Sequence, residues 1–186
     1  SFFQYAYVNT DPHPGNYLFQ PDGRIVFLDF GAVSPVDPTL IQSFQENVLA
    51  FMDDQHETFT QTAIQTYGFP TKDPQILDAY IHMVKHFLEP LHPAKQPFAF
   101  SKQWLDQFVT TSFQSGQKMI FPDGKTLPKL PPASKLHPDL RVLQRIGIGL
   151  SSLIGQLQAT ADWNQEARNI FALPKHNPPS DHPDAN

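Results

Sequence analysis

Two short apolar runs near the start of the chain, joined by a tight turn, constrain its folding more than any other feature. The runs are NYLFQ and RIVFLDF, and both are rich in aromatic and β-branched residues. The tripeptide PDG between them provides a glycine for the positive φ that such a turn requires. We therefore predict a β-hairpin over residues 16–30. A hairpin of this kind places the loop before its first strand next to the loop after its second strand.

Polar residues flank the predicted hairpin on both sides. Asp11 and Asn16 lie five positions apart in the loop before the first strand, and Asp29 follows thirteen positions after Asn16 in the tetrapeptide LDFG. This order of loop, strand, turn, strand and Asp-Phe-Gly is that of the catalytic and metal loops of kinases, where carboxylate and amide groups hold Mg²⁺ against a triphosphate. We predict that Asn16 and Asp29 meet on one ion. Alternatively, Asp11 and Asn16 are only turn residues and Asp29 is only a cap.

The rest of the chain is predicted to be mainly helical. Apolar residues recur at i, i+3 and i+4, and aspartates, often followed by proline, provide N-caps. These signals predict helices over residues 37–52, 54–67, 73–88, 101–117, 137–162 and 162–171. We expect a proline-rich connection over residues 120–132, and close helix packing at the glycines of RIGIGLSSLIG.

The composition excludes several classes of function. The 186 residues include no cysteine, which excludes disulfides, thiolate catalysis and zinc–thiolate sites. The formal net charge is −5 and no basic stretch is present, so no nucleic-acid partner is expected. The N-terminus does not resemble a signal peptide, and no apolar run approaches the roughly 20 residues of a membrane helix. We expect a protein of the cytoplasm or of an organelle interior that is not secreted; peripheral membrane contact is left open.

The segment NTDPHPGNYLFQPDGRIVFLDFGAV resembles the catalytic segment of the UbiB/ADCK (aarF-domain) family of atypical kinase-like proteins. In that family a Q/N-[AT]-D-P-x-P-x-N loop precedes a D-G turn and an L-D-F-G motif. The family binds ATP and is associated with ubiquinone biosynthesis and related lipid metabolism. The resemblance implies an α+β fold, the C-terminal lobe of a protein-kinase-like fold. Its parts would be the catalytic loop, hairpin and metal loop over residues 1–36, a helical body over 37–173 and a disordered tail over 174–186.

The resemblance also implies roles for single residues, with ATP and Mg²⁺ as cofactors. Asp11 would be the catalytic-loop carboxylate, Asn16 a Mg²⁺ ligand and Asp29 the principal Mg²⁺ ligand. Gly31 belongs to the cofactor-binding motif LDFG. His13 stands two positions after Asp11, where ordinary protein kinases carry a phosphate-contacting lysine. Because histidine is a weaker and pH-dependent cation, we weigh a catalytic role for His13 against a structural one.

Two departures from ordinary protein kinases matter. No A-P-E follows DFGAV, and a helix is predicted to begin within about six residues, so the segment that holds a peptide substrate is missing. This favours a small molecule or a lipid as substrate, or ATP hydrolysis itself. In addition, only ten residues precede Asp11, and they contain no ATP-covering loop, no strand lysine and no partner glutamate. We therefore expect an N-terminal lobe outside this chain, and for the chain alone weak metal binding and no kinase activity.

Other interpretations stay open. A small-molecule phosphotransferase of the aminoglycoside or choline kinase type shares D-x-H-x-G-N and I-D-F-G, but usually carries H-G-D where this chain has Asn9-Thr10-Asp11. An alternative of a different class is a non-catalytic scaffold for a lipid or a protein, with a vestigial site. His82 and His86 share a predicted helical face that could bind one metal, although a solvated or lightly buried face explains them better because no third ligand is evident.

Overall fold

The structure of the chain, a computed structural model, describes residues 2–11, 13–68, 73–108, 110 and 138–174. The N-terminal elements, with 3₁₀ turns written η, are α1 (Phe2–Tyr5), β1 (Tyr7–Asn9), η1 (Pro14–Asn16), β2 (Tyr17–Phe19), β3 (Ile25–Phe27) and β4 (Val33–Pro35). They are followed by α2 (Pro38–Met52), α3 (His56–Tyr67), α4 (Pro74–Leu88), η2 (Glu89–Leu91), η3 (Pro93–Lys95), β5 (Phe98–Ala99), α6 (Pro138–Gln156), β6 (Thr160–Ala161) and α7 (Trp163–Phe171). Residues 102–108 are also helical.

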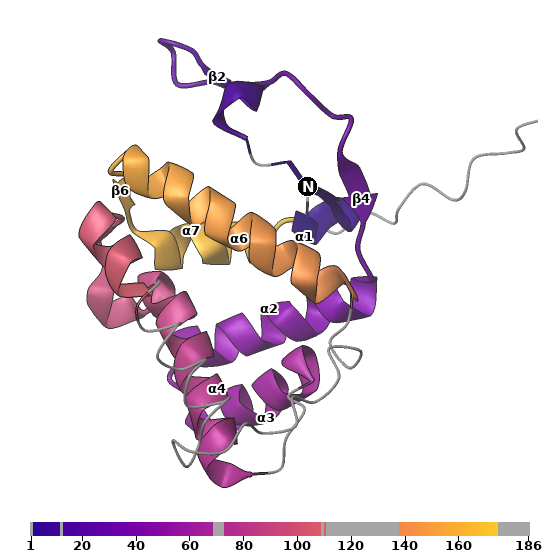
Figure 1. The fold of residues 1–186 in the computed structure, drawn as a ribbon, viewed down its shortest axis with the longest axis vertical. Helices are drawn as coiled ribbons and strands as arrows, with labels where there is room; N and C mark the ends of the chain where they lie inside the picture. Colours follow the sequence, from indigo (N-terminus) through magenta and orange to yellow (C-terminus); the bar gives the residue numbers. More distant parts are fainter. Residues whose placement is uncertain (1, 12, 69–72, 109, 111–137, 175–186) are drawn as a thin grey trace, which may run out of the picture.

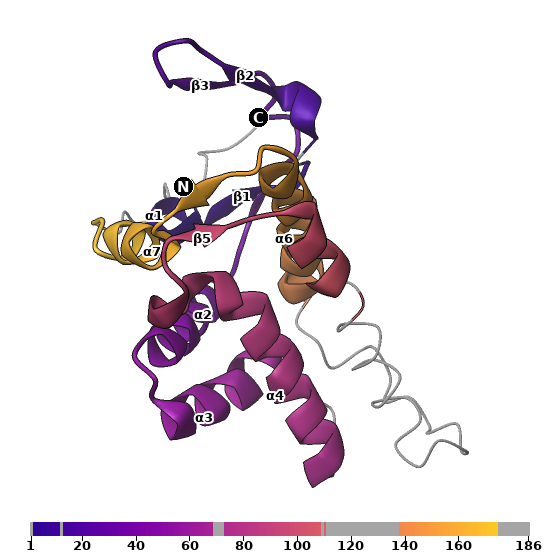
Figure 2. The same cartoon turned by 90° about the vertical axis from the view of Figure 1, so that its left-hand side faces the viewer.

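The predicted hairpin is present. β2 and β3 pair antiparallel, with Tyr17 opposite Phe27 and Phe19 opposite Ile25. Gly23 in the turn has φ +84°, in the left-handed region that favours glycine. Figures 1 and 2 show the hairpin projecting away from the helices. Many of its apolar side chains are exposed, namely those of Leu18, Phe19, Ile25, Val26, Phe27, Leu28 and Phe30.

A second strand pair, which the sequence patterns do not predict, lies at the base of the hairpin. β1 and β4 pair antiparallel, with Tyr7 opposite Pro35 and Asn9 opposite Val33. Each strand has only three residues, which is too short for an apolar alternation to be recognised. The helical turn α1 is a further difference, because only loop and strand are predicted over residues 1–33. The β1–β4 pair places the chain before the hairpin beside the chain after it.

The predictions for α2, α3 and α4 are confirmed. The side chain of Asp37 accepts a hydrogen bond from Thr39 N at 2.8 Å and caps α2, and Asp73 caps α4 in the same way. A proline follows each aspartate at the first helical position, where a backbone N–H has no intrahelical partner. α3 begins at His56, slightly later than predicted, and ends at Gly68 with φ +58°.

The largest core cluster lies where α2, α3 and α4 pack together. Its buried side chains are Val48, Ala50, Met52, Phe59, Ala63, Ile81, Val84 and Leu88. Asn47 is fully buried beside them, and its Nδ2 donates to Phe59 O at 2.9 Å and to Thr62 Oγ1 at 3.0 Å. Because a buried amide donor is costly without acceptors, these bonds favour one register of α2 against α3.

α6 is shorter than predicted. It ends at Gln156, and the expected helix over residues 157–162 is wrong because this segment turns back. Gln158 has φ +49°, and β6 then pairs antiparallel with β5, as Figure 2 shows. The short last helix is present as predicted: α7 begins at Trp163, and Asp162 is its N-cap.

Two glycines of α6 permit close packing, which confirms that expectation. A Cβ on Gly147 would lie 3.2 Å from Phe87 Cζ, and a Cβ on Gly155 would lie 2.4 Å from Leu105 Cδ1. A larger side chain would force these neighbours to move. The glycines therefore serve the contact of α6 with α4 and with the helix over residues 102–108.

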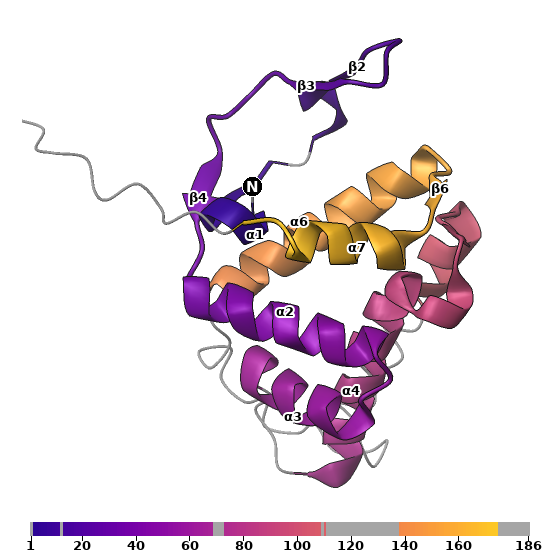
Figure 3. The same ribbon diagram turned by 180° about the vertical axis from the view of Figure 1, so that it is seen from behind.

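The segment that carries the hairpin is anchored on the helical body. A second core cluster joins the start of the chain to α2 and α6, with Val36, Leu40, Ile41 and Leu140 at its centre. Phe3 of α1 also lies edge-on to Phe171 of α7, with ring centroids 4.8 Å apart, and Figure 3 shows these helices from behind. Asp139 of α6 accepts a hydrogen bond from Asp37 N at 3.1 Å.

Some predicted segments lie outside the described residues. The helix expected over residues 101–117 is described only at 102–108 and 110. The proline-rich connection over 120–132 and the tail from residue 175 onward are not described. Among the described helices, none combines the length and the apolar character needed to cross a membrane.

Candidate functional site

The loops on the two sides of the hairpin are hydrogen-bonded to each other. Thr10 N donates to Ala32 O at 2.7 Å, and Thr10 Oγ1 donates to the same oxygen at 2.8 Å. Leu28 N donates to Asn16 O at 2.9 Å. The β1–β4 pair and these bonds hold residues 9–16 beside residues 28–33. The hairpin alone, which is all that the sequence predicts here, would not provide the Thr10 contacts.

Asn9 connects the two loops through its side chain. Its Oδ1 accepts a hydrogen bond from Asp11 N at 2.9 Å, and its Nδ2 donates to Asp29 O at 3.3 Å. Sequence reasoning missed this role. The available signal was the position of Asn9 two residues before Asp11, where an asparagine commonly bonds the backbone and forms a turn. We therefore count Asn9 as a positioning residue for both predicted carboxylates.

Asp11 and Asn16 are in direct contact. Asn16 Nδ2 donates to Asp11 Oδ2 at 3.1 Å and to Asp11 O at 3.4 Å. Asp11 is exposed and Asn16 is half-buried. In the part of the chain that the structure describes, neither Asn16 Oδ1 nor Asp11 Oδ1 has a hydrogen-bond partner. Both oxygens are therefore available to a ligand.

Asp29 uses one carboxylate oxygen to shape its own loop. Its Oδ1 accepts a hydrogen bond from Gly31 N at 2.7 Å. A Cβ at residue 31 would lie 3.1 Å from this oxygen, so glycine there lets the carboxylate approach the backbone. Asp29 is exposed, and within the described residues its Oδ2 has no hydrogen-bond partner.

The loops thus offer one uncommitted oxygen each from Asp11, Asn16 and Asp29. Carboxylate and amide oxygens, together with phosphate oxygens and water, are the ligands that Mg²⁺ takes in nucleotide sites. No cluster of three or more His, Cys, Asp or Glu side chains that could hold a metal is found among the described residues. A Mg²⁺ ion at these loops would therefore need the amide oxygen and ligands from a nucleotide. The meeting of Asn16 and Asp29 on one ion stays a prediction.

His13 caps a local turn. Its Nδ1 accepts a hydrogen bond from Gly15 N at 3.0 Å at the start of η1. His92 builds the same kind of turn in the helical body, where its Nδ1 accepts from Ala94 N at 3.2 Å at the start of η3. A proline follows each histidine. Because a His-Pro pair forms this turn away from the loops too, the geometry supports the structural role of His13.

Replacing His13 with alanine is expected to loosen this turn, because Gly15 N loses its acceptor. The bond is exposed, so the loss in stability should not exceed about 1 kcal/mol. In ¹H–¹⁵N spectra the Gly15 amide signal should move upfield and become more sensitive to temperature. A His13→Asn variant keeps an acceptor within reach and should retain the wild-type signal. An unchanged Gly15 signal in His13→Ala would contradict the capping role.

The histidine pair of α4 does not form a metal site with other described residues. His82 is exposed, whereas His86 is half-buried. His86 Nδ1 lies 3.2 Å from Glu89 Oε2, and its ring stacks on Phe108 with centroids 5.8 Å apart. The two rings therefore have different surroundings, and packing accounts for His86. Burial raises the pKa of the phenols of Tyr67 and Tyr80 in the same body, so both ionise only at a more alkaline pH than an exposed tyrosine does.

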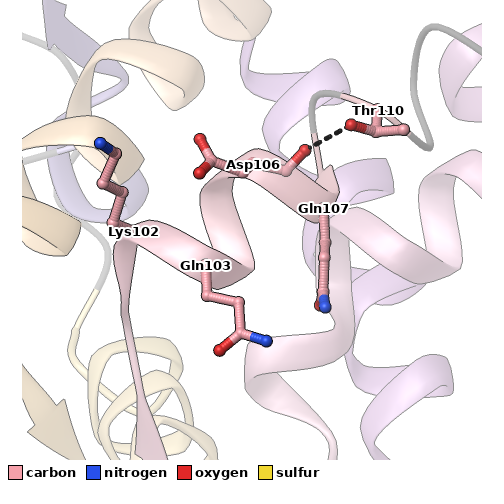
Figure 4. Close-up of a pocket in the computed structure, with 5 residues that line it drawn as sticks. All are labelled: Lys102, Gln103, Asp106, Gln107 and Thr110. Atoms are coloured by element: carbon pink, nitrogen blue, oxygen red, sulfur yellow. Dashed lines mark hydrogen bonds between the residues drawn. The ribbon is translucent and has the colours of Figure 1, made fainter.

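A wide hollow of about 550 Å³ lies along residues 102–110. Its lining residues are Lys102, Gln103, Asp106, Gln107 and Thr110. In Figure 4, Lys102 and Asp106 extend to one side of this segment, and Gln103 and Gln107 extend to the other. The dashed line marks the bond that Thr110 Oγ1 donates to Asp106 O at 2.8 Å. The described lining residues come from one short stretch of the chain and do not by themselves enclose a ligand, and none of the predicted site residues is among them.

The sequence of the hairpin region matches a known family. Residues 1–63 match the sequence model of the ABC1 atypical kinase-like domain. The matched segment contains both loops, the hairpin, α2 and part of α3. This confirms the resemblance inferred from the DPHPGN and LDFG motifs. The mostly helical structure with small antiparallel sheets is compatible with an α+β kinase-like lobe.

Several relatives extend the match. An uncharacterized chloroplastic aarF domain-containing protein kinase of Arabidopsis thaliana is 26% identical over 170 residues, which are 86% of this chain and 21% of that protein. A Synechocystis protein is 36% identical over 69 residues, 35% of this chain and 17% of its own length. The chloroplastic Arabidopsis protein called activity of bc1 complex kinase 3 is 55% identical over 31 residues, 17% of this chain and 4% of that protein. The chain spans about a fifth of the length of the first two of these relatives.

Proposed function

Because residues 1–63 belong to the ABC1 atypical kinase-like domain family, we propose that the chain supplies the catalytic and metal loops of an ATP- and Mg²⁺-dependent phosphotransferase or ATPase. Asp11 orients or deprotonates the attacking group, and Asn16 and Asp29 hold Mg²⁺ against the phosphates. Asn9 positions the backbone of both loops. In line with the family resemblance, the activity belongs to quinone or lipid metabolism.

The observation that carries this proposal is the side-chain bond between Asn16 Nδ2 and Asp11 Oδ2, at 3.1 Å on an exposed loop. Residues that serve only as turn formers bond the backbone near them, as the Asp29 carboxylate does with Gly31 N. Asn16 Nδ2 also donates to Asp11 O at 3.4 Å, but its bond to the Asp11 carboxylate joins two side chains, and among the described residues the amide oxygen has no hydrogen-bond partner. A free amide oxygen beside a carboxylate is a group that Mg²⁺ can take as a ligand, which supports the proposed role of Asn16.

The short connection after the LDFG motif limits which molecules can accept the phosphoryl group. Between Gly31 and the start of α2 at Pro38 the structure contains only β4 and short flanking segments. A kinase that binds a peptide needs an extended segment at this position. The acceptor in this proposal is therefore a small molecule, a lipid or water.

The exposed hairpin supports a two-lobed arrangement. Phe19, Phe27 and Phe30 are 56%, 48% and 68% exposed. Contiguous apolar surface of this kind usually marks an interaction site, and the relatives are much longer than the matched region. In the proposed enzyme, the nucleotide lies between the two loops and a further lobe of a longer polypeptide, and that lobe covers the hairpin.

Nucleotide-dependent thermal stability tests the proposal. For the complete gene product, saturating Mg-ATP should raise the melting temperature by roughly 5 °C or more, because a ligand of the native state stabilises it. Mg²⁺ alone, or ATP with EDTA, should have little effect. The 186-residue chain alone should show a much smaller shift, because its described residues form no second wall over the loops. The absence of any shift in the complete gene product would favour the non-catalytic scaffold, and an equal shift with EDTA would exclude the metal.

A further inference from the structure

An apolar cavity lies in the helical body, away from the loops. Its volume is about 240 Å³, and it forms where α1, α2, α4, α6, α7 and the helix over residues 102–108 meet. Its inner wall is nearly inaccessible to solvent and includes Val48, Leu88, Phe100 and Trp104. Its rim is half-exposed and includes Ser151 and Phe171. The cavity is therefore apolar inside and open on one side.

Among the described residues of the buried wall, Trp104 carries a polar side-chain group, its indole N–H. This residue is 8% exposed, and in the part of the chain that is described its Nε1 has no acceptor within hydrogen-bond distance. The ring centroids of Phe100 and Phe108 lie 5.1 Å and 5.5 Å from the ring centroid of Trp104, and these contacts hold the indole in place. Because buried indole N–H groups normally find an acceptor, a molecule that brought one would relieve an uncompensated cost.

We propose that this cavity binds the end of an uncharged apolar chain that carries a hydrogen-bond acceptor such as a carbonyl oxygen. None of the described residues that line the cavity carries a charged side chain, so a buried carboxylate or ammonium group would find no charged partner among them. An apolar cavity of about 150 Å³ binds benzene, whereas pockets that enclose drug-sized ligands exceed about 300 Å³. The cavity therefore accepts a chain end, and the rest of the molecule leaves through the rim near Ser151.

The two tryptophans of the chain make a direct test in the 186-residue protein. Trp163 Nε1 already donates to Phe98 O at 2.9 Å and serves as an internal reference. Titration with 2-octanone should move the Trp104 indole N–H signal downfield and saturate, without moving the Trp163 signal. The methyl signals of Val48 and Leu88 should shift over the same concentrations.

Two further probes test separately whether the ligand needs a hydrogen-bond acceptor and whether it must be uncharged. Cyclohexane, which has no acceptor, should shift the methyl signals of the cavity without the downfield change at Trp104. Octanoate should bind at least about 10-fold more weakly than 2-octanone, because its carboxylate would lose water without gaining a cation. Methyl shifts by 2-octanone that leave the Trp104 signal unmoved would overturn the assignment of the acceptor. Shifts confined to the exposed hairpin, at Leu18 and Val26, would overturn the site.

Neighbouring serines of α6 provide a matched pair of variants. Ser151→Leu extends a side chain into the rim and should weaken 2-octanone binding at least about 10-fold. Ser152 does not line the cavity, so Ser152→Leu should bind as the wild type does. Equal binding by both variants would contradict the site. If Ser151→Leu fails to fold, Trp104→Phe tests the site instead. This variant keeps an aromatic ring but loses the indole N–H, so the 2-octanone affinity should fall about 5-fold. None of these results depends on nucleotide binding.

Discussion

An Asp29→Asn variant of the complete gene product is expected to lose at least about 100-fold in Mg²⁺-dependent turnover of ATP, with little change in folding stability. Asparagine keeps an oxygen that accepts the bond from Gly31 N, which Asp29 Oδ1 accepts at 2.7 Å in the wild type. It removes the negative charge that the uncommitted Oδ2 would offer to the ion. The measurements are phosphate release at several Mg²⁺ concentrations and the Mg-ATP thermal shift.

Asp22→Asn is the matched control for this experiment. Asp22 is an exposed carboxylate on the same hairpin, where it bonds Arg24 Nε at 2.7 Å across the turn. Loss of an exposed pair of this kind costs little stability, and turnover should stay within a factor of about two of wild type. If Asp29→Asn bound Mg-ATP and turned it over as well as the wild type, the proposed role of Asp29 would be wrong. Equal losses in both variants would point to a general effect on the hairpin.

A Phe59→Ala variant should lose about 3–5 kcal/mol of folding stability, a large part of the total for a domain of this size. Phe59 is 1% exposed at the centre of the core formed by α2, α3 and α4. Its ring lies 5.6 Å from that of Phe51 and 5.7 Å from Lys85 Nζ. Truncation removes these contacts and leaves a void that packed helices cannot fill. Urea denaturation followed by circular dichroism measures the loss.

Phe19→Ala is the control for that prediction. Phe19 lies on the hairpin and is 56% exposed, so the same truncation should change the stability of the 186-residue chain by no more than about 0.5 kcal/mol. A large loss in Phe19→Ala would mean that the hairpin surface is already covered in the isolated chain. A small loss in Phe59→Ala would contradict the packing of α3 against α2 and α4.

Much of the local structure follows from the sequence because its signals act over a few residues. Gly23 marks the hairpin turn, and Asp37 and Asp73 mark the starts of α2 and α4, each through a bond to a backbone N–H two residues away. The resemblance of residues 1–63 to the ABC1 atypical kinase-like domain was also readable from the sequence, because its motifs lie within one short segment. The helical spacing of apolar residues continues past the end of α6, so it wrongly predicted helix over residues 157–162. There the pairing of β6 with β5 determines the structure instead of the local helical preference.

The tertiary structure alone decided which distant residues meet at the loops. β1 and β4 pair over three residues each, and Asn9 bonds Asp29 O from twenty positions away. Neither contact leaves a pattern in the sequence, because short strands and single amides gain their stability only when the partner segment is already held nearby. The same holds for the cavity beside Trp104, which exists because several helices from distant parts of the chain meet there. The sequence by itself thus determined the family resemblance of residues 1–63, the hairpin and most helices, whereas long-range packing decided how the loops and the cavity are assembled.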